Sequence, residues 1–98
     1  MSRIQLTAKA ESDLGAIFEF YSNLMGEKGA REVIDTLLSK LWDLQAFPSM
    51  GRPSQVSGVR ELVYIQYPFV APYRYVHPHD RIEVLRFLHQ SSERPQDW

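Results

Sequence analysis

The residue types best suited to chemistry in this sequence are arginines and a histidine in its second half. Arg86 and His89 lie three residues apart in a segment that alternates polar and apolar side chains. RNA cleavage needs an imidazole to protonate the leaving oxygen and a guanidinium to stabilise the charged phosphorane. In a regular strand, residues three apart point to opposite faces unless the strand ends or bulges between them. For His89 we therefore predict a structural histidine bonded to a backbone carbonyl, with the catalytic role as the alternative.

Arg60 and Arg74 lie among apolar residues of two further segments. Unpaired charges are rarely buried, so each arginine is expected either to pair internally or to contact a target. The internal partners would be Glu61, Glu83 or a backbone carbonyl. Together with Arg86 they fall on three consecutive predicted strands, so at least two are expected to be neighbours if the register allows it.

The segment His77-Pro-His-Asp80 contains three residues that could ligate a metal ion. Three ligands within four residues are too few and too close to enclose a structural zinc ion, whereas proline and aspartate are typical of a hairpin turn. We therefore predict a turn, with no metal site and no cofactor. The absence of cysteine excludes disulfides and thiolate metal sites.

Length and charge restrict the class of protein. The 98 residues suit one domain, residues 1–98, and the net charge is −1. Residues 1–50 hold five basic and seven acidic residues, and residues 51–98 hold six arginines, no lysine and five acidic residues. Strong direct nucleic-acid binding is not expected without a basic excess. No signal peptide or membrane span is recognised, so we expect a cytoplasmic protein.

Hydrophobic periodicity predicts the elements that would position these side chains. Residues 3–7 alternate as in a short strand, and Thr7 is placed to cap a helix. Two apolar stripes with helical spacing follow, the first ending near Gly26 and the second at Pro48. The stripes are Leu14, Ile17, Phe18, Tyr21 and Leu24, then Val33, Ile34, Leu37, Leu38, Leu41, Leu44 and Phe47. Their short connection, Gly26 to Gly29, predicts an antiparallel helical hairpin.

From Gly58 the period changes from 3.6 to 2, after a predicted loop over residues 48–54. Strands are predicted over residues 59–65, 69–76 and 81–89, and the short turns between them make an antiparallel meander. Pro72 cannot donate a ladder hydrogen bond, which implies a bulge or an unpaired flank. The predicted order is β-α-α-β-β-β, an α+β domain with the hairpin on one face of the sheet.

Several segments taken together resemble the toxins of bacterial RelE/ParE toxin–antitoxin pairs, and the likeness is closer to the ParE branch. They keep their order and spacing over almost the whole chain. They are residues 8–14, Gly51-Arg52, Gly58-Val-Arg-Glu-Leu-Val63, Tyr67-Pro-Phe-Val-Ala-Pro-Tyr-Arg-Tyr75 and Ile82-Glu-Val-Leu-Arg-Phe-Leu-His89.

The resemblance implies one of two activities. RelE-like members are ribonucleases that cut mRNA in the ribosomal decoding site, and here their residues would be drawn from Arg60, Arg74, Arg86 and His89. ParE-like members inhibit DNA gyrase without known chemistry, and the same four residues would then contact the target. An arginine that RelE-like enzymes carry early in the middle strand aligns near Phe69, and this favours the ParE-like alternative. A third alternative is a homologue that only binds an antitoxin.

The resemblance also implies a cognate antitoxin, ParD-like or RelB-like, that wraps around the toxin in a hetero-oligomer. We expect a partner helix to fill an apolar groove beside the sheet. The candidate groove residues are Leu14, Phe18, Tyr21, Leu41, Phe47 and Tyr73. Filling this groove should stabilise a domain of this size. Trp98 is either a loose tail or an apolar anchor.

Overall fold

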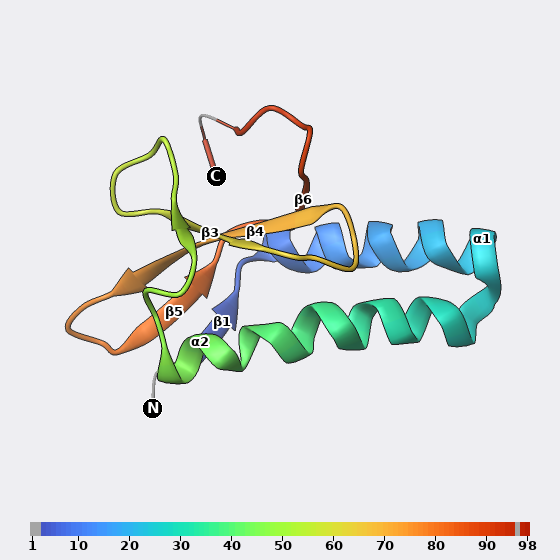
Figure 1. Ribbon diagram of the computed structural model, residues 1–98, viewed down its shortest axis with the longest axis horizontal. Helices are drawn as coiled ribbons and strands as arrows, with labels where there is room; N and C mark the ends of the chain where they lie inside the picture. Colours follow the sequence, from blue (N-terminus) through green and yellow to red (C-terminus); the bar gives the residue numbers. More distant parts are fainter. Residues whose placement is uncertain (1–2, 96) are drawn as a thin grey trace.

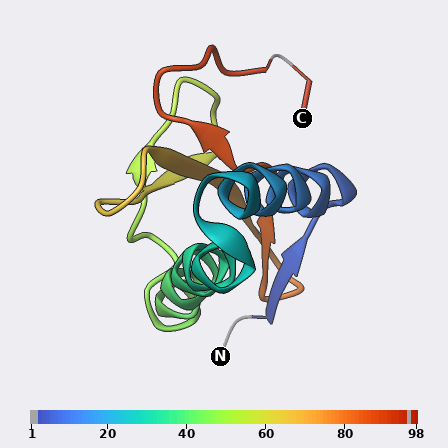
Figure 2. The ribbon, with the colours of Figure 1, turned by 90° about the vertical axis from the view of Figure 1, so that its right-hand side faces the viewer.

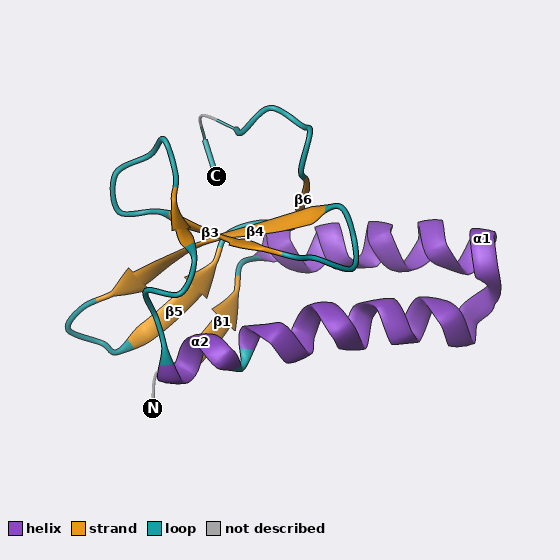
Figure 3. Ribbon diagram, in the orientation of Figure 1, coloured by secondary structure: helices purple, strands orange, loops and turns teal. Residues whose placement is uncertain are grey.

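The computed structural model describes residues 3–95 and 97–98 (Figure 1). Two helical arms cover one face of a sheet, and the C-terminal segment runs over the other face (Figures 1 and 3). The predicted α+β class is confirmed. The elements are β1 (Arg3–Leu6), α1 (Ala8–Leu41), α2 (Asp43–Ala46), β2 (Arg52–Pro53), β3 (Arg60–Val63), β4 (Phe69–Val76), β5 (Arg81–Val84) and β6 (Leu88–His89). No helix in the described part of the chain is both long and apolar enough to cross a membrane.

The helical hairpin is formed by α1 alone, which reverses direction at Gly26. Thr7 caps its start, because the Thr7 hydroxyl oxygen accepts a hydrogen bond from the Ala10 amide at 3.0 Å. Gly26 has a φ of 86°, a backbone conformation that residues with side chains rarely adopt. The first arm, residues 8–25, and the second arm, residues 27–41, consequently run antiparallel (Figure 1), and Figure 2 views both arms end-on. One residue makes the reversal, rather than the predicted connection from Gly26 to Gly29.

The second arm is shorter than the sequence predicts, because it ends at Leu41 and the chain turns at Trp42 into the short α2. Leu44 still reaches the core. The stripe is wrong, however, for Leu24 near the reversal and for Phe47 after α2, since both side chains are 67% exposed. Apolar spacing along a helix therefore identified which face is buried. It did not identify the positions at which no other element packs against that face.

The sheet has the order β1-β5-β4-β3-β2, and β6 also pairs with β4. The meander β3-β4-β5 is antiparallel as predicted, while β1 joins its edge parallel to β5. β2 lies within the segment predicted as a loop and pairs with β3. The helix-facing side of the sheet completes the core with Leu62, Tyr64, Ala71, Tyr73, Ile82 and Val84.

The strand predicted over residues 81–89 is interrupted by a bulge opposite Pro72. Val84 pairs with Tyr73, and Leu88 pairs with Val70. Three residues, 85–87, therefore face the two residues 71–72 of β4, which is the extra residue that defines a bulge. The Leu85 amide donates to the Pro72 carbonyl at 2.8 Å, so proline contributes its acceptor although it lacks a donor. The irregularity that Pro72 predicted is confirmed, and it separates β5 from β6.

Candidate functional site

Arg86 lies in the bulge and binds Asp13 on the first helical arm. Its Nε donates to Asp13 Oδ2 at 2.7 Å and its Nη2 donates to Asp13 Oδ1 at 3.0 Å. The same carboxylate accepts from the Phe87 amide at 3.0 Å. Hydrogen bonding to Asp13 raises the pKa of the Arg86 guanidinium. Arg86 therefore forms an internal salt bridge that connects the bulge to α1.

Arg60 and Arg74 lie on opposite faces of the sheet. Arg60 pairs with Tyr73 in the ladder, and Arg74 is the next residue along β4, so its side chain points the other way. Arg60 Nη1 donates to the Gly51 carbonyl at 2.7 Å, and Arg74 lies 3.5 Å from Glu83. The expected internal partners, a carbonyl and Glu83, are both found. The expected clustering of Arg60, Arg74 and Arg86 is not found.

His89 is exposed at the end of the short β6. Its Nδ1 accepts from the Ser91 amide at 3.1 Å, in place of the predicted bond to a carbonyl. The imidazole also contacts the ring of Phe69, with 6.2 Å between centroids. Because the Arg86 guanidinium binds Asp13 on α1, it is not available to stabilise a charged phosphorane beside His89. The four candidate residues do not converge on one position where a phosphate could react.

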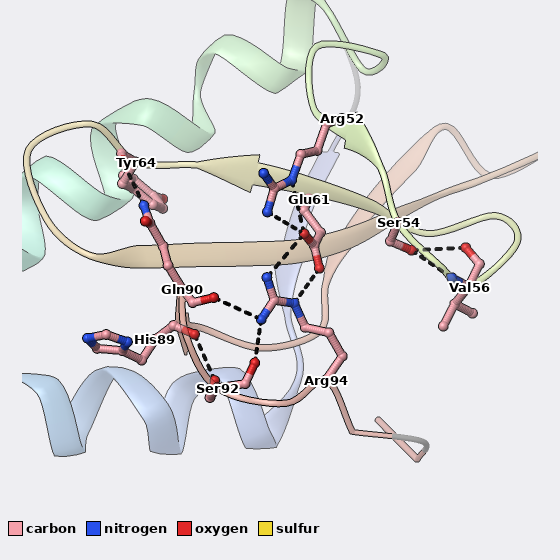
Figure 4. Close-up of polar contacts among 9 residues, drawn as sticks. All are labelled: Arg52, Ser54, Val56, Glu61, Tyr64, His89, Gln90, Ser92 and Arg94. Atoms are coloured by element: carbon pink, nitrogen blue, oxygen red, sulfur yellow. Dashed lines mark hydrogen bonds and ion pairs between the residues drawn. The ribbon is translucent and has the colours of Figure 1, made fainter.

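A charged cluster that the sequence did not predict lies on the outer face of the sheet (Figure 4). Glu61 is only 5% exposed, yet it accepts from Arg94 Nε at 2.6 Å and from Arg52 Nη2 at 3.0 Å. The hydrogen bond from Arg94, aided by Arg52, lowers the pKa of Glu61 against the opposing effect of burial. Arg94 Nη1 also donates to the Ser92 carbonyl at 2.6 Å.

This cluster holds the C-terminal segment against β3. Gln90 assists, because its side chain donates to the Tyr64 carbonyl at 3.1 Å. The sequence offered one signal, an acid between Arg60 and Leu62 in an apolar strand. It could not identify Arg94, 33 residues away, as the partner. Trp98, whose role the sequence left open, is partly buried.

The His77-Pro-His-Asp80 segment forms the predicted turn between β4 and β5. The Tyr75 hydroxyl donates to Asp80 Oδ1 at 2.6 Å, and the Tyr75 and His77 rings meet edge to face at 4.2 Å between centroids. Among the residues that the structure describes, no three histidine, aspartate or glutamate side chains come together as a metal site.

An apolar hollow of about 470 Å³ lies between the first helical arm and the β4–β6 region. Phe20, Tyr21 and Phe69 line it, and His89 stands beside them. Phe20 is 61% exposed, and Leu24 and Met25 extend the exposed apolar surface toward the reversal at Gly26. The sequence missed Phe20 because it lies off the helical stripe; an aromatic residue in that position was the available signal.

The six candidate groove residues are only partly brought together. Tyr21 lines the hollow, while Leu14 and Phe18 are partly buried nearby on the same arm. Leu41 is a core residue, so the expectation that it lines an open groove beside the sheet is wrong. Tyr73 is also buried, and it lines a separate pocket beside Ser49 and Ser54 rather than this hollow. Phe47 is exposed, but it lies beyond α2, next to Ser49 and Met50.

This architecture is shared with the toxins of solved toxin–antitoxin systems. A chain of the chromosomal ParDE system from P. aeruginosa superimposes with a TM-score of 0.81 and 36% identity, covering 91% of this chain and 96% of that one. A chain of the intact E. coli RelBE complex gives a TM-score of 0.69 at 11% identity, covering 96% and 100%. The fold therefore defines the class of protein, a toxin of the RelE/ParE type.

Sequence comparison identifies the family. Residues 4–94 match the family described as "ParE toxin of type II toxin-antitoxin system, parDE". Y4kP of Sinorhizobium fredii, named as a candidate toxin, is 29% identical over 94 residues, covering 96% of this chain and 94% of its own length. The chain belongs to the ParE toxin family of type II toxin–antitoxin systems.

Proposed function

We propose that this protein inhibits DNA gyrase by binding it, without covalent chemistry of its own, and that a cognate antitoxin neutralises it. The observation that carries this proposal is the 36% identity to the ParDE chain, against 11% and 17% for chains of two RelBE complexes. This higher sequence identity to the ParE branch favours gyrase inhibition over the ribonuclease activity of RelE-like members.

The placement of the candidate residues supports binding rather than catalysis. RNA cleavage needs an acid, a base and a cation around one phosphate. Arg86 is bound to Asp13, and Arg74 faces the side of the sheet opposite to Arg60. The His89 ring contacts Ser91 and Phe69. The resemblance aligns an arginine of RelE-like enzymes near Phe69, whose ring here packs against the core.

We place antitoxin binding on the apolar hollow and the exposed side chains beside it. Phe20, Leu24 and Met25 follow one another along the first arm, and the hollow continues this surface toward Phe69. Exposed apolar side chains beside an apolar hollow suit the apolar face of a partner helix. The solved ParDE and RelBE systems support the presence of an antitoxin partner here.

One preparation of the chain tests this function in two assays run side by side. We expect the toxin to block gyrase supercoiling or to accumulate cleaved gyrase–DNA complexes, and to leave ribosome-bound mRNA intact in primer extension. The matched control is the same preparation saturated with antitoxin, which should restore supercoiling. Site-specific mRNA cuts with gyrase unaffected would identify a ribonuclease. Antitoxin binding with neither effect would identify a homologue that only binds its antitoxin.

A further inference from the structure

Arg60 has no acidic partner among the described residues, in contrast to five other arginines in or beside the sheet. Arg86 binds Asp13, Arg74 lies beside Glu83, and the remaining pairs are Arg52 and Arg94 with Glu61 and Arg81 with Glu83. Within the part of the chain that the structure describes, the sole polar partner of the Arg60 side chain is the Gly51 carbonyl. One positive charge on the helix-facing side of the sheet is thus left uncompensated.

Arg60 lines a pocket of about 370 Å³ between the 48–59 segment and β4. The polar lining includes Ser49, Ser54 and Ser57, and the apolar walls include Pro53 and Val59. None of the lining residues is an aspartate or glutamate. The pocket therefore combines a guanidinium that has no acidic partner, hydroxyl groups and apolar walls, which is the composition of a site for an anion on an apolar stem.

The guanidinium is held in place before any ligand arrives. The Tyr73 hydroxyl donates to the Pro48 carbonyl at 2.7 Å and accepts from the Gly51 amide at 2.8 Å, which fixes the segment beside the pocket. Gly51 in turn holds Arg60 through its carbonyl. A side chain that is already ordered loses less conformational entropy on binding, so this arrangement favours recognition.

We propose that this pocket binds a carboxylate carried by an apolar segment of a partner protein. One guanidinium gives little of the counterion release that drives binding to a phosphate backbone, and the chain as a whole carries a charge of −1. Val56 lines the pocket and Met50 follows Ser49, and both are exposed. An acidic residue flanked by apolar residues matches this combination. The pocket could bind such a segment whichever protein the toxin inhibits.

Binding of two synthetic peptides, acetyl-Val-Glu-Val-amide and acetyl-Val-Gln-Val-amide, to the full chain tests the proposal by NMR. The glutamate peptide should shift the Arg60 Nε–H and the amides of residues 54–60 saturably. The glutamine peptide should bind at least tenfold more weakly, because it lacks the charge that a guanidinium recognises. Equal affinities for the two peptides would overturn the proposal.

Variants and a second probe complete the test. Arg60→Gln should weaken binding of the glutamate peptide at least tenfold. The matched control, Arg74→Gln on the opposite face, should leave it within twofold. If Arg60→Gln fails to fold, Arg60→Lys replaces it: severalfold weaker binding supports recognition by the guanidinium, and undiminished binding contradicts it. Inorganic phosphate binding the same residues more tightly than the glutamate peptide would also overturn the assignment to a protein carboxylate. None of these outcomes alters the result of the gyrase assay.

Discussion

Replacing Arg86 with alanine is predicted to unfold the protein at a markedly lower temperature, and any loss of toxicity would follow from that unfolding. The substitution removes both hydrogen bonds to Asp13 and leaves its carboxylate without its counterion. The Phe87 amide would still donate to this carboxylate, but the link between the bulge and α1 would be lost. The two elements lie 73 residues apart in the chain, so the bond closes a long loop of the fold.

The structure sets the expected magnitude. Breaking a fully buried ion pair by removing one partner costs about 3–5 kcal/mol. The Arg86 and Asp13 side chains are 22% and 17% exposed, so water partly compensates, and we expect a loss of about 2–4 kcal/mol. In a domain of this size about 1 kcal/mol shifts the melting temperature by roughly 4–8 °C. Arg86→Ala should therefore lower it by at least about 8 °C.

Circular dichroism melts and urea titrations at neutral pH measure this loss. The matched control is Arg74→Ala, because its 3.5 Å pair with Glu83 is 43% exposed on the arginine side and should contribute less than about 1 kcal/mol. For the double variant Asp13→Ala/Arg86→Ala, the decrease in the free energy of unfolding should be smaller than the sum of the decreases in the two single variants, by at least about 1 kcal/mol. An Arg86→Ala protein that melts like the control, or strictly additive losses, would refute the reasoning.

Three further predictions concern other parts of the molecule. Gly51→Ala should lower the free energy of unfolding by about 1–3 kcal/mol in urea titrations, because its Cβ would lie 2.6 Å from Tyr73 Cε1. Its control, Gly15→Ala, has open space around the new Cβ and should stabilise α1 slightly. Because the pKa of Glu61 is lowered in the folded protein, ionised Glu61 stabilises the fold fully above its usual pKa of 4.5. This stabilisation is lost as the pH falls through the pKa that Glu61 has in the folded state. In urea titrations from about pH 6 to about pH 3, the free energy of unfolding should fall less steeply for Glu61→Gln than for the unchanged protein. An equally steep fall would exclude Glu61 as the source of the pH dependence. Antitoxin at 100 times its Kd should stabilise the toxin by about 2.7 kcal/mol, and Phe20→Ser should remove most of the thermal shift at the same concentration; an equal shift for Phe20→Ser would exclude this surface.

Local chemistry in the sequence was enough to predict the elements and several of their boundaries. Thr7 as a cap and the reversal at Gly26 depend on neighbours within a few residues, and both are confirmed. The helical stripes depend on local spacing too, and they are confirmed except at Leu24 and Phe47. Pro72 predicted an irregular strand for the same reason, since a missing amide donor is a property of the residue itself. The family resemblance also rested on short segments whose order and spacing the sequence displays directly.

The tertiary structure decided which charged groups are occupied and which are available. Asp13, the partner of Arg86, lies 73 residues away, and Arg94, one of the two partners of Glu61, lies 33 residues away. These pairings depend on the bulge and on the path of the C-terminal segment. Arg60 and Arg74 looked equivalent in the sequence, but strand register sends them to opposite faces and leaves only Arg60 without an acid. Periodicity reports the face on which a side chain lies. Long-range pairing determines what it meets there, because hydrogen bonds and burial depend on elements brought together by the whole fold.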